Sequence, residues 1–131
     1  MNSLDIKKDR QKLQKQLERE CTVLCQAVVK KRAGGRCEVT GIKGITESHH
    51  IFRRGTYPIL RYEPDNQVAL INKGHYKFHA QGENALKEFM IKRRGIEWYD
   101  NLVKIKQNQT FQWSVEKLQE QKTKLEKELN E

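Results

Sequence analysis

The sequence contains no apolar run that approaches the ~20 residues a membrane-spanning helix requires. Its first ten residues are charged and lack an apolar segment, so we expect no secretory signal there. The sequence therefore argues against a membrane protein and against a secreted precursor, and we expect no membrane partner.

Cysteine is scarce, with three residues in the chain, which is an odd number. Cys21 and Cys25 lie one helical turn apart in a charged helical pattern, and no second Cys or His pair remains to complete a metal site with them. A disulfide scaffold is disfavoured, because helical patterns already account for most of the chain. We expect reduced thiols and a cytoplasmic protein.

Acidic residues are fewer than basic ones: the chain has 17 Asp and Glu and 26 Lys and Arg, which gives a net charge of +9. A charge of this size favours a polyanion such as DNA, RNA or an anionic membrane surface. The alternative is a basic protein with no such partner. The length of 131 residues corresponds to one domain, and we find no internal repeat.

Both ends of the chain are predicted to be helical. Over residues 3–32 the apolar positions follow helical steps: Leu13, Leu17, Cys21, Leu24 and Val28. The pattern ends at Ala33-Gly34-Gly35, where glycines stop a helix. Residues 83–131 form further helices, with a break at Gly95. Ser114 can cap the last helix, whose apolar stripe is narrow and needs a partner. That partner is either the N-terminal helix or a second chain, in a homodimer through the terminal helices.

The central residues 36–82 have a different pattern. Residues 37–41 are predicted to form a short strand and turn, residues 48–52 a second short strand, and residues 75–80 a short helix. We therefore expect an α+β fold that is mainly α, with a central ββα unit flanked by N-terminal and C-terminal helices, in a single domain over residues 1–131.

All four histidines fall within this central region. His75 and His79 project from one face of a helix, because residues four apart are neighbours, and can chelate a metal. Adjacent strand residues point to opposite faces, so one of His49 and His50 can complete the metal site. The other can take a proton from water as a general base. Metal, base and positive charge together favour phosphodiester hydrolysis.

The residues that carry this pattern are Ser48-His49-His50-Ile51, Asp65-Asn66-Gln67 and His75-Tyr76-Lys77-Phe78-His79. The pattern resembles the HNH (ββα-metal) endonucleases, in the version found in colicin-type DNases. The resemblance implies that His49, His75 and His79 bind one divalent metal ion, that His50 is the general base, and that Asn66 holds the loop that orients the base. Three imidazoles suit zinc or nickel, whereas related nucleases often use magnesium or manganese.

A wider pattern is formed by the segments Arg36–Gly41, His49–Arg54 and Leu60–Asn66. It resembles phage-type HNH proteins of the NinG (Rap) recombination-endonuclease group, and this resemblance extends over residues 20–129. This resemblance implies a phage-encoded DNA endonuclease that nicks branched or recombination DNA, with one strand cut per centre. Members often carry two CxxC pairs that bind a structural zinc. Here only Cys37 remains, while Thr40, Ile71 and Gly74 occupy the other places. We therefore expect no zinc knuckle, and a Cys37 that packs as a small apolar residue.

Basic residues follow the motif closely, and those expected to contact DNA phosphates are Arg53, Arg54, Arg61, Lys73 and Lys77. A solvated charged face is the alternative interpretation. No segment resembles a module that reads base sequence. Two further functions remain open: a non-catalytic, metal-stabilised nucleic-acid-binding module, and a helical interaction protein.

Overall fold

A computed structural model describes residues 2–72 and 83–131. Within these ranges the chain is a mainly helical α+β protein with four α-helices and one two-stranded antiparallel hairpin. The helices are α1 (Ser3–Arg32), α3 (Glu83–Arg94), α4 (Ile96–Lys106) and α5 (Val115–Leu129); the strands are β1 (Glu47–His50) and β2 (Gln67–Leu70); the 3₁₀ turns are η1 (Pro58–Leu60) and η2 (Pro64–Asn66). None of the helices in the described ranges has the length and apolar character needed to cross a bilayer.

Helix α1 is bounded as its sequence predicts. The side chain of Asn2 accepts a hydrogen bond from the backbone N–H of Asp5 and caps the first turn. The helix ends before Gly34 and Gly35, whose φ angles of +63° and +71° permit the sharp exit of the chain. The predicted boundary at residue 32 is confirmed.

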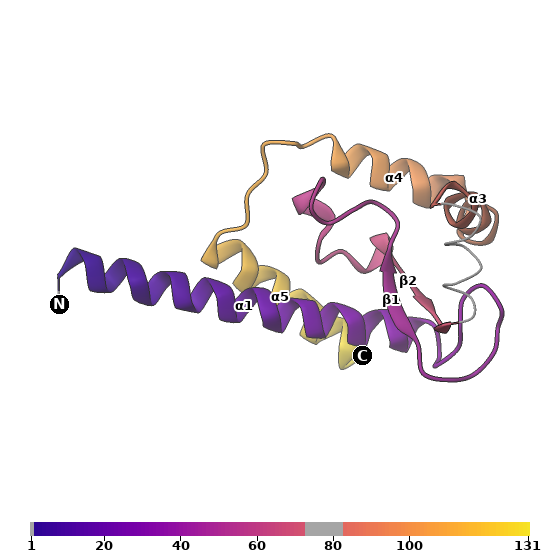
Figure 1. Ribbon diagram of the computed structural model, residues 1–131, viewed down its shortest axis with the longest axis horizontal. Coiled ribbons are helices and arrows are strands. Elements are labelled where there is room, and N and C mark those ends of the chain that lie inside the picture. Colours follow the sequence, from indigo (N-terminus) through magenta and orange to yellow (C-terminus); the bar gives the residue numbers. More distant parts are fainter. Residues whose placement is uncertain (1, 73–82) are drawn as a thin grey trace.

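The long terminal helices pack against each other, so the last helix has its partner within the same chain (Figure 1). Ser114 caps α5 by accepting a hydrogen bond from the backbone N–H of Lys117. The shared core contains Leu17, Cys21, Cys25, Val28, Tyr62, Val115, Leu118 and Leu125. Leu13, which was expected on the same apolar face, is 40% exposed. Its neighbour Gln14 donates a hydrogen bond to the carbonyl of Trp113, just ahead of α5.

The contribution of this helix pair to the stability of the fold can be tested at Leu118, because its side chain is fully buried in the core. Replacing a buried leucine with alanine removes apolar contacts and leaves a cavity, so Leu118→Ala should lower the free energy of unfolding by about 2–5 kcal/mol. Urea denaturation followed by circular dichroism measures the loss. Leu4, which is 57% exposed in the first turn of α1, provides the control. A Leu118→Ala protein as stable as Leu4→Ala would contradict the packing of α5 on α1.

The β-hairpin differs from the strands that the sequence predicts. β1 overlaps the expected strand at 48–52, but its partner is Gln67–Leu70 and not residues 37–41. Residues 38–40 form a turn, closed by a single bridge between Arg36 and Lys43. All four residues of β2 are buried, so the strand shows no alternation of polar and apolar side chains. The expected first strand was therefore wrong.

The hairpin lies between the α1/α5 pair and the α3/α4 pair (Figure 1). On the α3 side, Val68 and Leu70 pack with Leu86 and Met90 of that helix. Cys37 belongs to the same cluster and is 1% exposed, which confirms that it packs as an apolar residue. The predicted break at Gly95 is also confirmed: its φ of +98° separates α3 from α4.

Candidate active site on the hairpin

The two adjacent histidines occupy the end of β1. His49 is paired with Val68 and His50 with Gln67. Residues that lie directly opposite in an antiparallel pair share a face of the sheet. His49 therefore lies on the face of Val68, which packs toward α3, whereas His50 lies on the face of Gln67, which bonds to Cys25 of α1.

His50 is half-buried and held by one backbone group. Its Nε2 lies 3.2 Å from the carbonyl oxygen of Arg61. A carbonyl oxygen can only accept a hydrogen bond, so Nε2 carries the proton and Nδ1 keeps its lone pair when the ring is neutral. Burial lowers the pKa of His50 below 6.5, and the positive charges of Arg54 and Arg61 lower it further, against the opposing effect of the Arg61 carbonyl. His50 is therefore neutral near pH 7.

A small cavity adjoins the His50 ring on the side of α1. Its volume is about 20 Å³, enough for one water molecule in a polar setting. The residues that line it are Thr22, Gln26, His50, Arg54, Arg61 and Gln67. The arrangement thus places space for a water, an imidazole and two guanidinium groups together.

Asn66 is completely buried and ties the end of β1 to the loop that follows it. Its Oδ1 accepts from the backbone N–H of Phe52 at 2.9 Å, and its Nδ2 donates to the carbonyls of Phe52 at 2.9 Å and Leu60 at 3.2 Å. The backbone carbonyl of Asn66 also accepts from Ile51 at 2.8 Å. Because Leu60 directly precedes Arg61, these bonds also place the carbonyl that holds His50.

The arginines expected to contact DNA have different settings. Arg53 and Arg54 are exposed on the loop directly after the hairpin. Arg61 is partly buried, with its guanidinium 5.4 Å from the centre of the Tyr62 ring. The contact with the Tyr62 ring restrains Arg61 beside His50. Arg53 and Arg54 are more exposed and can be reached by a ligand from solution.

The other four predicted site residues, His75, His79, Lys73 and Lys77, lie outside the described residues. Within residues 2–72 and 83–131 no group of three or more His, Cys, Asp and Glu side chains could hold a metal ion. The only predicted metal ligand in the described part of the chain is His49. β2 ends at Leu70, opposite Glu47 at the start of β1, so the chain leaves the hairpin toward His75 from that end.

Cys21 and Cys25 are free thiols in the α1/α5 core. Burial raises the pKa of Cys21 to about 11 and that of Cys25 to about 12. Both are therefore protonated at neutral pH and function as packed apolar side chains, whereas a metal ligand would have to be a thiolate.

Arg94 is a positioning residue that the sequence did not indicate, because Lys92-Arg93-Arg94 reads as a solvated basic run. Its guanidinium donates to the carbonyls of Asp65 and Gln67, at 3.1 and 3.0 Å, and pairs with Glu38 at 2.7 Å. The other carboxylate oxygen of Glu38 accepts from the backbone N–H of Ala69 at 2.7 Å. Arg94 follows Leu86 and Met90 at steps of four, and this spacing places it on the buried face of α3.

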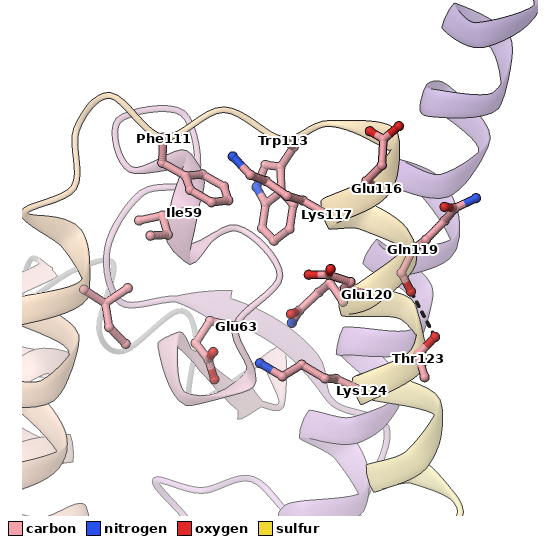
Figure 2. Close-up of a pocket in the computed structure, with 12 residues that line it drawn as sticks. Ile59, Glu63, Phe111, Trp113, Glu116, Lys117, Gln119, Glu120, Thr123 and Lys124 are labelled. Carbon is pink, nitrogen blue, oxygen red and sulfur yellow. Dashed lines mark hydrogen bonds between the residues drawn. The ribbon is translucent and has the colours of Figure 1, made fainter.

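A larger cavity, of about 920 Å³, lies against α5 on the side of η1 and the end of α4 (Figure 2). Phe111 and Trp113 form one wall and Glu63 and Lys124 another; His50 is not part of the lining. Its lining includes three carboxylates and two lysines: Glu63, Glu116, Glu120, Lys117 and Lys124. This charge balance does not favour the binding of a polyanion. Burial also raises the pKa of Glu63. We therefore assign the candidate active site to the hairpin.

Comparison of the chain with protein-family models, with curated proteins and with solved structures finds no match.

Proposed function

We propose that this protein is a metal-dependent DNA endonuclease of the HNH class, phage-encoded, which nicks branched or recombination DNA in the host cytoplasm. The observation that carries the proposal is His50: a neutral imidazole held through Nε2 by a backbone carbonyl, on a hairpin fastened by a buried asparagine. A neutral imidazole beside space for a water is what a general base requires.

The proposed reaction starts with a water that donates a proton to Nδ1 of His50 while its oxygen bonds to phosphorus. The bond from phosphorus to the 3′ oxygen breaks, and this oxygen leaves with the bonding electron pair. Arg54, exposed beside the same cavity, is placed to compensate the negative charge on the phosphoryl oxygens.

A divalent metal would be held by His49 together with His75 and His79. Three neutral imidazoles are a donor set that fits zinc or nickel. When bound, the metal supplies positive charge to the leaving 3′ oxygen.

The position of β1 at the edge of the described sheet supports access of one phosphate to both histidines. The outer side of β2 is covered, because the backbone N–H of Glu38 donates to Ala69 and its carboxylate accepts from the same residue. In the described ranges no third strand pairs with β1. A phosphate that approaches this edge meets His49 on one face of a single strand and His50 on the other.

The first test is cleavage of supercoiled plasmid and of four-way-junction DNA with magnesium, manganese, zinc or nickel. We expect nicked circles with at least one of these metals and none in EDTA, because the leaving oxygen needs the metal charge. The product should be nicked before it is linear, since one centre cuts one strand. A protein that holds one zinc tightly and cuts neither DNA with any metal would favour the non-catalytic nucleic-acid-binding module.

A further inference from the structure

The loop between α1 and β1 exposes two isoleucines that the proposed reaction does not use. Ile42 is 53% exposed and Ile45 is 92% exposed, so nearly the whole side chain of Ile45 faces solvent. Single exposed apolar residues are common on protein surfaces. Here two of them share one turn, and this turn leads directly into the strand that carries His49 and His50.

Backbone hydrogen bonds hold this loop in a defined shape. The N–H of Cys37 donates to the carbonyl of Ile42 at 2.9 Å, and the N–H of Gly44 donates to the carbonyl of Gly35 at 3.1 Å. Gly41 turns the chain with a φ of +75°, and Thr46 is buried at 4% exposure directly after Ile45. The isoleucines therefore project from an ordered turn, so little conformational freedom is lost when they insert into a ligand.

The loop lies close to the candidate active site and carries positive charge. Ile45 precedes His49 by four residues, so their Cα atoms are at most about 14 Å apart. Arg36 and Lys43, which form the bridge at the base of the turn, are both exposed. The loop arches outward at the end of the molecule opposite the N-terminus, beyond the hairpin (Figure 1).

We propose that residues 41–46 form a wedge that inserts Ile45 between stacked bases of DNA. The proposal rests on the proposed nuclease function for the identity of the ligand. Apolar side chains that unstack a base step are a recurrent device of DNA-bending proteins. Lys43 and Arg36 contact the phosphates on either side of the step, and Ile42 packs against the exposed sugar or base edge. Insertion needs a step that opens easily, and branch points and flexible pyrimidine–purine steps provide it.

The experiment uses the full chain in EDTA, so that binding is measured without cleavage. The probes are duplex and four-way-junction DNA that contain 2-aminopurine, a base whose fluorescence rises on unstacking. At saturating wild-type protein we expect a several-fold rise, greatest for 2-aminopurine beside the branch point. The Ile42→Ser Ile45→Ser double variant should bind the same DNA with nearly the same Kd, because the phosphate contacts remain, and should produce no rise.

Leu4→Ser is the matched control, since it removes a 57% exposed apolar side chain at the opposite end of the molecule. It should leave the fluorescence rise unchanged. An equal rise with the double variant at equal occupancy would overturn the wedge, as would binding of the isoleucines to phosphatidylserine vesicles in place of DNA. Metal-dependent nicking without any unstacking would overturn the wedge alone. Unstacking without nicking under any metal would overturn the nuclease function alone.

Discussion

Replacing His50 with alanine should abolish DNA cleavage and leave DNA binding intact. The variant loses the Nδ1 that we propose as the acceptor of the proton from the attacking water, and removal of a general base typically costs about 10²–10⁴ in rate. The phosphate contacts that we propose for Arg53 and Arg54 do not involve the imidazole. Single-turnover cleavage measures the rate, and fluorescence anisotropy in EDTA measures binding.

Gln26→Ala is the control for this variant, because Gln26 lines the same cavity from α1 and carries no titratable group. It should retain cleavage. A His50→Ala protein that cuts at the wild-type rate would remove His50 from the role of base.

The pH profile gives a second readout of the same residue. Burial holds the pKa of His50 below 6.5, so the neutral form, which we propose as the base, persists below the pH at which an ordinary histidine is half protonated. Cleavage should therefore be level near neutral pH and decline only below pH 6.5. The unfolded chain binds this proton more readily than the folded chain. As the pH falls below 6.5, protonation of His50 therefore lowers the free energy of unfolding. A midpoint for cleavage at or above 6.5 would contradict the buried, base-competent imidazole.

Asn66→Ala should destabilise the fold and reduce cleavage together. The change leaves two buried backbone groups, the N–H and the carbonyl of Phe52, without their partner, whereas the carbonyl of Leu60 still accepts from the N–H of Glu63 at 3.3 Å. Each unsatisfied buried group costs about 1–3 kcal/mol, so we expect a loss of about 2 kcal/mol or more in the free energy of unfolding. Chemical denaturation measures this loss.

Two further variants separate the contributions of Asn66. Asn66→Asp keeps an acceptor for the N–H of Phe52 but loses both donated bonds, so it should be destabilised as well. Asn101→Ala changes an exposed asparagine on α4 and should shift stability by no more than about 0.5 kcal/mol. An Asn66→Ala protein as stable as Asn101→Ala would show that Asn66 does not fasten the loop.

The helices could be predicted from the sequence, because their boundaries depend on local chemistry. Gly34, Gly95 and Ser114 act through their own backbone conformation or side chain, whatever the rest of the chain does. The partner of α5 could not be decided, since an apolar stripe is equally satisfied by α1 or by a second chain. β2 was missed because it is covered on both faces, and this depends on α1 and α3 being in place.

The site could be predicted only in part. The spacing of His49 and His50 indicated two neighbouring imidazoles on opposite faces of a strand, and β1 has them in this relation. The partner of His50, the carbonyl of Arg61, has no sequence signal, because every residue has a carbonyl and only the fold selects one. The ligand set that includes His75 and His79 stays a prediction.

The pairing of the first helix with the last has a consequence for how the site is assembled. Tyr62 lies in the α1/α5 core, and its carbonyl accepts a hydrogen bond from Gln121 at 2.7 Å. The neighbouring carbonyl, that of Arg61, orients His50. The thiol of Cys21 donates a hydrogen bond to the carbonyl of Leu118, which lies 97 residues further along the chain. Contacts between segments so distant in sequence form slowly, because a long loop must close first. On the ribosome, α5 emerges after α1 and the hairpin, so the Gln121 bond beside the carbonyl that orients the imidazole forms only after residue 121 has been synthesised.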